Sequence, residues 1–485
     1  MLAPDPVFLG IDVGTSGVKA VLLDSGGAVT AQATAPLEVS RPKPLWSEQN
    51  PDDWCSAAEA AVLALPADLR GKVAAVGLAG QMHGATLLGA DDRPLRPAIL
   101  WNDGRSHAEC TELEAEVPAL RASAGNLAMP GFTAPKLAWV RKHGPHVFAQ
   151  VRSVLLPKDY LRLHLTGDKA SDLSDSAGTL WLDVARRDWS DELLAATGLA
   201  REHMPSLHEG PEVTGTLRGA VAARWGMDPV PVVAGAGDNA AGAVGVGAVC
   251  DGDALLSLGT SGVIFVATDR FRPNPAGAVH AFCHCLPGMW HQMSVHLSAA
   301  SCLDWAAALT GRTVADLLSA AEQAGAAVGP ELFLPYLSGE RTPHNDPHVR
   351  GALLGLSHDS DAGRIAAAVL EGVAFAHADG LAALIDASTT VARLSVIGGG
   401  SRSRHWGTVL TAALLRPLDF LDGGEIGPGL GAARLAMIGV GGASVVEACP
   451  RPAVRETVEP DPALAEQLAP KLARFRAVYP ALKAL

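Results

Sequence analysis

The sequence Gly-Thr-Ser-Gly-Val occurs twice, at residues 14–18 and 259–263, about half of the 485-residue chain apart. Each copy lies between two aliphatic runs, which predicts two antiparallel strands joined by a tight turn. Glycine lets backbone N–H groups approach a phosphate closely, and the threonine and serine hydroxyls add donors. The repeat therefore predicts two phosphate-binding turns, formed by Gly14, Thr15 and Ser16 and by Gly259, Thr260 and Ser261.

The two predicted hairpins differ at one charged position. Asp12 lies two residues before Gly14, whereas Ser257 occupies the corresponding place in the second copy. A carboxylate beside a phosphate turn favours a ligand for a metal ion or for water. The asymmetry predicts that the metal lies beside the first turn and that the second supplies neutral donors. A single such turn most often only connects strands, and it is the repetition that favours function.

A second acidic residue lies at a predicted junction between a strand and a helix. The strand predicted at 230–234 leads into Gly-Asp-Asn at 237–239, where small neighbours leave Asp238 open to a bound ligand. Asp238 is placed to meet a substrate, but aspartate also often caps the helix that follows it. The local sequence favours the two interpretations equally.

Two further apolar runs end in clusters of hydrogen-bonding residues, as expected where α/β folds bind ligands. Residues 73–79 lead into Gly-Gln-Met-His-Gly at 80–84, and Ile99-Leu100 leads into Trp-Asn-Asp at 101–103. Trp101 can cover an apolar face of a small ligand while its polar neighbours bind hydroxyl groups. Alone, a histidine or tryptophan here would more often be a packing residue, but together the clusters favour a sugar site. A third glycine loop, at 398–400, permits close contact with a base or sugar.

Composition bounds the class of protein. A chain of this length is expected to form at least two domains, and 48% hydrophobic with 18% charged residues is typical of a globular protein. A net charge of −13 without a basic stripe argues against nucleic-acid or anionic-membrane partners. We expect no export signal at residues 1–6, no apolar run of membrane-spanning length, and seven reduced cysteines, hence a cytoplasmic protein. Cys283-His284-Cys285 lacks a second ligand pair at zinc spacing, so we expect core packing there.

Together these motifs resemble those of the FGGY carbohydrate kinases, in the superfamily of actin, hexokinase and the heat-shock chaperones. The resemblance runs from about residue 8 to about residue 438 and is greatest to bacterial kinases of D-xylulose, because Gly-Gln-Met-His-Gly and Trp-Asn-Asp are the discriminating motifs. The segments that carry it are residues 11–16, 80–84, 100–105, 237–242, 258–262, 336–344 and 397–400.

The resemblance implies an α/β fold of two ribonuclease-H-like domains, at residues 1–248 and 249–485, with ATP and sugar meeting in an active-site cleft between them. Closure of the domains over the substrates is a further expectation. Glu340 and Arg341 are expected to brace the hinge between the domains rather than to take part in the chemistry. Lys19 is given little weight as a phosphate ligand.

The resemblance also implies roles for individual residues. Asp238 would be the catalytic base and Asp12 would hold Mg²⁺, while both Gly-Thr-Ser-Gly turns stabilise phosphate charge. The ketose pocket would be lined by Gln81, Met82, His83, Trp101, Asn102, Asp103 and Asn239. The adenosine of ATP would be held by Gly399, Gly400 and Ser403.

The implied activity is ATP-dependent phosphorylation of D-xylulose to D-xylulose 5-phosphate. The family often forms homodimers, and the resemblance extends that expectation to this chain. Two alternatives stay open: the same chemistry on a related pentulose or polyol such as ribulose or glycerol, and a non-catalytic nucleotide-dependent binding protein of the same fold. The second alternative fits less well, because such proteins lack a sugar pocket.

Overall fold

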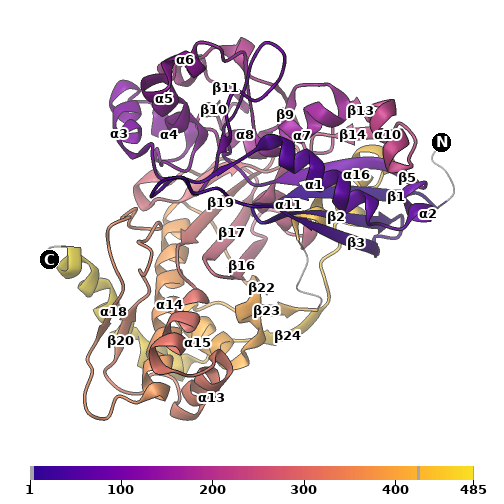
Figure 1. The fold of residues 1–485 in the computed structure, drawn as a ribbon. Coiled ribbons are helices and arrows are strands. Elements are labelled where there is room, and N and C mark those ends of the chain that lie inside the picture. The colour runs from indigo at the N-terminus through magenta and orange to yellow at the C-terminus, as the bar shows by residue number, and fades with distance from the viewer. Residues whose placement is uncertain (1–4, 423–426, 484–485) are drawn as a thin grey trace.

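The computed structural model describes residues 5–422 and 427–483. In these residues, two seven-stranded sheets form the framework (Figure 1). The first has the order β13-β14-β5-β1-β2-β3, with β15 pairing with β5. Its strands are β1 (Val7–Val13), β2 (Gly17–Asp24), β3 (Val29–Pro36), β5 (Val73–Gly80), β13 (Val213–Thr216), β14 (Pro231–Val233) and β15 (Ala236–Gly237).

The second sheet has the order β18-β19-β17-β16-β22-β23-β24. Its strands are β16 (Ala254–Leu258), β17 (Gly262–Thr268), β18 (His280–Cys283), β19 (Trp290–His296), β22 (Leu394–Ile397), β23 (Leu418–Leu421) and β24 (Val454–Val458). Both sheets contain the same arrangement: three antiparallel strands, β3-β2-β1 or β19-β17-β16, are followed by two parallel ones, β5-β14 or β22-β23. The repeated mixed sheet confirms the predicted fold class.

Each predicted phosphate turn connects the first two strands of its sheet. Val13 pairs with Val18 across the first hairpin, and Leu258 pairs with Gly262 across the second. Every residue of β1 is buried, which explains why this strand is an uninterrupted apolar run apart from Gly10 and Asp12. The two turns therefore project from rigid, buried strands.

Helices α11 (Asp238–Gly245) and α16 (Pro428–Gly441) pack together and cover the first sheet. α16 comes from the C-terminal half of the chain but contacts β1 and β5 directly. The approach requires glycine, because a Cβ atom at Gly77 or Gly431 would overlap backbone atoms of Ala432 or Ala241. The chain therefore returns to the first sheet after building the second, and the domain division at residues 248/249 stays a prediction.

Helix α14 (Ala362–Asp386) forms the centre of the second unit, between α13 (Val314–Ala324), α15 (Arg404–Leu414) and the sheet (Figure 1). In length and composition it could cross a membrane, which the sequence analysis did not anticipate. However, 89% of its apolar window is buried inside the protein, as in the core helix of a globular domain. Its apolar surface is therefore already covered by α13, α15 and the sheet.

The remaining elements complete these units, and those between residues 100 and 218 include a mainly helical lobe beside the first sheet (Figure 1). In the first half of the chain they are α1 (Pro51–Leu63), α2 (Ala67–Arg70), α3 (His107–Glu116), α4 (Leu120–Ala124), α5 (Thr133–His143), α6 (Pro145–Phe148), α7 (Pro157–Thr166), α8 (Leu173–Ala177), α9 (Asp191–Ala196), α10 (Gly219–Trp225), β4 (Glu48–Gln49), β6 (Thr86–Leu88), β7 (Ala98–Ile99), β8 (Ser153–Leu155), β9 (Ala170–Asp172), β10 (Leu182–Asp183), β11 (Asp188–Trp189) and β12 (Ser206–His208). In the second half they are α12 (Ser301–Thr310), α17 (Val445–Ala448), α18 (Pro462–Lys483), β20 (Leu332–Leu334) and β21 (Ala352–Leu354).

Candidate active site

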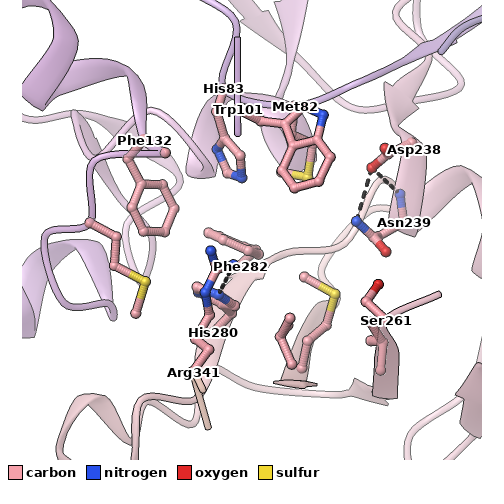
Figure 2. Close-up of a pocket in the computed structure, with 15 residues that line it drawn as sticks. Met82, His83, Trp101, Phe132, Asp238, Asn239, Ser261, His280, Phe282 and Arg341 are labelled. Atoms are coloured by element: carbon pink, nitrogen blue, oxygen red, sulfur yellow. Dashed lines mark hydrogen bonds between the residues drawn. The ribbon is translucent and has the colours of Figure 1, made fainter. Parts of the chain in front are cut away.

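A cavity of about 240 Å³ lies where the two halves of the chain meet. Figure 2 shows His83, Trp101 and Met82 on one side, Asp238 and Asn239 beside them, and Ser261, His280, Phe282 and Arg341 across the space. Its walls are formed by Met82, His83, Trp101, Met129, Gly131, Phe132, Asp238, Asn239, Ser261, Val263, His280, Phe282, Met293, Val295 and Arg341. The structure thus brings six of the predicted site residues, Met82, His83, Trp101, Asp238, Asn239 and Ser261, to one cavity.

Asp238 is the first residue of α11, and Gly237 occupies the N-cap position. The cap interpretation therefore does not describe this carboxylate. Its Oδ1 accepts hydrogen bonds from the backbone N of Asn239 at 2.7 Å and from Asn239 Nδ2 at 2.9 Å. Burial raises the pKa of Asp238 to about 6, although the hydrogen bonds from Asn239 act to lower it. At neutral pH the group is an ionised carboxylate that is able to accept a proton.

Asp12 is buried on β1 near Asp238. Burial and then the charge of Asp238 raise the Asp12 pKa to about 7, while the charge of Lys19 acts to lower it. Lys19 faces Asp12 in the register of the first hairpin, so it acts on this site more strongly than the sequence analysis allowed. Asp12 Oδ1 is buried without a hydrogen-bond partner among the residues described. An oxygen ligand of this kind, within range of a second carboxylate, fits a hard divalent cation such as Mg²⁺.

His83 presents one ring nitrogen to the cavity (Figure 2). Its Nδ1 lies 2.6 Å from the carbonyl oxygen of Gly178, and since a carbonyl only accepts, Nδ1 carries the proton. Burial and the charge of Lys136 lower the His83 pKa to about 3, so the ring stays neutral. Nε2 is therefore a hydrogen-bond acceptor. The ring is held edge-on against Phe132, with centroids 4.7 Å apart.

Gln81 does not line the cavity, in contrast to its predicted role as a sugar ligand. It is buried, and its Oε1 accepts from the Thr15 hydroxyl at 3.1 Å. The same hydroxyl accepts from Trp101 Nε1 at 2.9 Å. Gln81 therefore connects the cavity wall to the first turn, and the hydroxyl hydrogen of Thr15 is already used within the protein. The backbone of this turn and Ser16 remain as its predicted phosphate donors.

Asn102 and Asp103 also lie away from the cavity. Asp103 is buried in an ion pair with Arg105, whose Nη2 lies 2.6 Å from Asp103 Oδ2, and it accepts a hydrogen bond from the backbone N of Ser47. Asn102 is exposed and borders a separate groove formed with residues 41–47. The apolar run before Trp101 contributes only the two-residue strand β7, so these side chains follow a loop rather than a strand of the main sheet.

The second turn places the Ser261 hydroxyl at the cavity and Gly262 against the protein core. Ser261 lines the cavity, and Thr260 beside it is exposed. Gly262 packs so closely on the His377 ring that a Cβ atom there would overlap it. The turn is anchored by hydrogen bonds from the backbone N of Ala300 to Gly259 and of Ala299 to Thr260. This geometry suits a rigid cradle for an anion.

Residues 7–245 match the model of the FGGY family of carbohydrate kinases, N-terminal domain, and residues 254–440 match that of the C-terminal domain. The chain belongs to the FGGY family of carbohydrate kinases. It is 54% identical over 477 residues to the xylulose kinase of Escherichia coli (strain K12), covering 98% of each chain. It is 56% identical over 436 residues to that of Klebsiella pneumoniae, covering 90% of each. The crystal structure of a xyloylose kinase from Brucella ovis has a TM-score of 0.95, 50% identity and 99% coverage of both chains.

As a kinase of this family, the protein uses ATP and a sugar as substrates. The loop predicted to hold adenosine in this FGGY kinase connects β22 to α15, directly beside the second turn. Gly398 has a positive φ of 88°, and a Cβ atom at Gly400 would press against Leu258, the residue before that turn. A Cβ atom at Gly399 would meet no other atom within 4 Å. Ser403 accepts a hydrogen bond from the backbone N of Trp406 and so caps α15. Their contact with adenosine stays a prediction.

Part of the cavity wall comes from the second half of this FGGY kinase and was not predicted from the sequence. Arg341 lies on the cavity wall, with Nη1 3.3 Å from His280 Nε2, although it had been expected only to brace the hinge. Glu340 is held within the second half of the chain, where its buried Oε1 accepts from the backbone N of Leu297 at 3.0 Å, and its role at the hinge stays a prediction. The motif Ser-Gly-Glu-Arg-Thr-Pro-His at 338–344 was the available signal. The sequence around Phe282 gave no such signal, because a single aromatic residue in a strand is usually a core residue.

The Cys-His-Cys motif lies behind this cavity, and its residues pack in the protein interior. Cys283 ends β18 and belongs to the cluster that includes Phe282, whereas Cys285 lies beyond the strand in a different cluster. Both cysteines are core residues, as expected. No disulfide joins any of the seven cysteines.

Proposed function

We propose that this FGGY kinase transfers the γ-phosphoryl group of ATP to the terminal hydroxyl of D-xylulose, giving D-xylulose 5-phosphate and ADP. The observation that carries the proposal is the single cavity in which a partly buried carboxylate, Asp238, meets a neutral histidine, His83, and the hydroxyl of Ser261 on the second turn. The xylulose kinases from two bacteria, 54% and 56% identical over at least nine-tenths of this chain, support the choice of sugar.

In this proposal, Asp238 is the general base. Its carboxylate accepts the proton of the terminal hydroxyl while the hydroxyl oxygen attacks the γ-phosphorus in line. The new oxygen–phosphorus bond forms as the bond from the γ-phosphorus to the bridging oxygen breaks, and ADP leaves with that electron pair. Asn239 holds the carboxylate through two hydrogen bonds to Oδ1. Among the described residues, none donates a hydrogen bond to Oδ2, the second carboxylate oxygen.

The cavity walls would orient the sugar. His83 Nε2 accepts a hydrogen bond from a sugar hydroxyl, because the proton on the ring is held at Nδ1 by Gly178. The carbon skeleton of the sugar would be covered by the apolar side chains of Met82, Phe132 and Phe282, which exclude water from the reacting oxygen. Arg341 adds a cationic donor on the opposite wall. A pocket with a mainly apolar lining and a few polar groups suits a small polyhydroxylated substrate.

The phosphate groups would lie between the two turns. The backbone N–H groups of Gly14 and Gly259 close the turns by donating to the carbonyl oxygens of Gly17 and Ser261. The other backbone N–H groups of the two turns, with the hydroxyls of Ser16, Thr260 and Ser261, would supply the donors. Asp12 would hold Mg²⁺, for which its orphaned buried oxygen provides a fitting ligand. When bound, Mg²⁺ neutralises charge that develops on the phosphoryl oxygens. Gly399, Gly400 and Ser403 would contact the adenosine.

The pH profile follows from the raised pKa of Asp238. The base must be ionised, so with saturating Mg·ATP we expect kcat/KM for D-xylulose to fall about tenfold per pH unit below an apparent pKa of about 6. Above that value the profile should be level, because Mg²⁺ bound at saturating Mg·ATP would keep Asp12 ionised. The measurement is kcat/KM from pH 4.5 to 8 at constant ionic strength. An acid limb near the ordinary aspartate pKa of about 4 would contradict the burial of a required carboxylate at this site.

The substrate assignment is tested by ADP release with Mg·ATP and a panel of D-xylulose, D-ribulose, L-ribulose, L-xylulose and glycerol. We expect kcat/KM for D-xylulose to exceed that for glycerol by at least about 100-fold, because loss of several hydroxyl contacts leaves buried polar groups unpaired. A preference for another ketose or for glycerol would keep the kinase and overturn the sugar. ATP hydrolysis at the same rate with and without sugar would overturn the phosphotransferase function.

A further inference from the structure

Five ionisable side chains without solvent exposure lie in the protein interior behind Asp238. Lys158 Nζ lies 2.6 Å from Asp159 Oδ1, 2.8 Å from Asp172 Oδ1 and 3.3 Å from Asp175 Oδ2. Arg162 is equally buried on the same helix, α7. The desolvation cost of burying ions offsets much of the free energy gained from their pairing. A buried cluster of this size is therefore weak evidence for a role in stability alone. Asp172 and Asp175 belong to the Ser-Asp-Leu-Ser-Asp segment at 171–175, which does not line the cavity described above.

Electrostatic pairing holds this cluster together. Burial raises the pKa of Asp175 well above its usual range, while the charge of Lys158 acts to lower it. The nearby carboxyl groups raise the pKa of Lys158 against the effect of burial, which keeps the amine charged. Lys158 contacts all three carboxyl groups, so the cluster is a tightly paired unit in the protein interior.

Two hydrogen-bonded connections join this unit to the junction that carries Asp238. The Ser174 hydroxyl donates to Asp172 Oδ2, because a carboxylate only accepts, and it accepts in turn from the backbone N of Gly237 at 3.1 Å. Gly237 is the N-cap residue of α11, directly before Asp238. On the other side, Arg162 Nη2 donates to the carbonyl oxygens of Val233 and Ala234 at 2.7 and 2.6 Å.

We propose that Ser174 is a positioning residue for catalysis: held by Asp172 and Lys158, its hydroxyl fixes the Gly237–Asp238 turn so that the Asp238 carboxylate meets the sugar hydroxyl. This inference rests on the proposed function. Without the hydroxyl, the buried N–H of Gly237 loses its acceptor, and the backbone shifts to find another one. A displacement of about 1 Å in a reacting group lowers the rate by up to about 100-fold.

The chain offers a matched control in the same short helix. Ser176 is as fully buried as Ser174, but its hydroxyl donates to Ser171 Oγ at 3.0 Å and makes no contact with Gly237. Ser174→Ala and Ser176→Ala each remove one buried hydroxyl from α8, so both should lower Tm to a similar extent. Only the first removes the acceptor at the Asp238 junction.

The test compares kcat, KM for D-xylulose and Tm for both variants. We expect Ser174→Ala to lower kcat about 10- to 100-fold with KM changed less than about threefold, and Ser176→Ala to keep kcat within about twofold. Unchanged kcat in Ser174→Ala, or an equal loss in both variants, would overturn the proposal. If Ser174→Ala does not fold, Ser174→Cys takes its place, because a thiol fills the space but is a weak acceptor.

Asp238→Asn is measured in parallel, so that failure of this inference can be told from failure of the proposed function. Wild-type turnover in Asp238→Asn would remove the proposed base and, with it, the reason for positioning that residue. Loss of turnover in Asp238→Asn together with full kcat in Ser174→Ala would leave the base in place and overturn only the role of Ser174.

Discussion

Asp238→Asn is expected to lower kcat for sugar phosphorylation by about 10²- to 10⁴-fold, the range contributed by a positioned general base. Asparagine has nearly the same shape, and its amide oxygen can still accept the two hydrogen bonds from Asn239. It cannot take the proton of the sugar hydroxyl at neutral pH. KM for Mg·ATP should change little, because Asp238 meets the sugar end of the site. Steady-state ADP release, corrected for wild-type contamination, gives both constants.

A matched control for this substitution is Asp316→Asn. Asp316 lies in the first turn of α13, as Asp238 lies in the first turn of α11, but it is exposed and serves only the capping box with Thr313. We expect wild-type kcat and a small decrease in Tm from the weakened cap. Asp238→Asn with kcat within about threefold of wild type would contradict general-base catalysis by this residue.

Asp12→Asn is expected to raise the Mg²⁺ concentration required for half-maximal activity by at least about 10- to 100-fold at fixed ATP, because an amide is a poorer ligand than a carboxylate for a hard cation. At saturating Mg²⁺ we expect kcat to remain reduced, since the site loses charge beside the phosphoryl group. The measurement is a Mg²⁺ titration of ADP release, with metal-free Tm as a second readout.

The Tm readout separates loss of a ligand from damage to the fold. The folded-state pKa of Asp12, about 7, lies above that of an unfolded aspartate, so its ionisation costs stability increasingly as the pH rises from about 4 to 7. Asparagine has no such cost, and we expect metal-free Asp12→Asn to be at least as stable as wild type at pH 8. Asp24→Asn, at the exposed far end of the same hairpin, should leave the Mg²⁺ requirement unchanged. An unchanged requirement in Asp12→Asn would contradict a metal role.

Local patterns predicted the elements that depend on local sequence. Both predicted glycine hairpins are present. Strand β24 at residues 454–458 was not predicted, because its largely exposed residues form a strand only by pairing with β23. The packing of α16 on the first sheet was also beyond prediction, since it depends on glycine contacts between segments far apart in the chain.

In the candidate site, the residues at strand ends could be predicted, but their orientation could not. Met82 and His83 follow β5 and face the cavity, whereas Gln81, one residue earlier, is buried against Thr15. The sequence pattern carries residue type and spacing, not the direction of a side chain after a strand ends. Phe282 and Arg341 reach the cavity because the second half of the chain folds against the first, and only tertiary structure reveals that.

The most direct test of the central claim is to identify the product formed from D-xylulose and Mg·ATP by phosphorus and proton NMR. The account predicts ADP and a phosphate monoester in equal amounts, with the ester phosphorus coupled to the protons of the terminal CH₂ distant from the carbonyl, and no ester in Asp238→Asn on the same timescale. Inorganic phosphate in place of the ester, or an ester at another hydroxyl group, would contradict it.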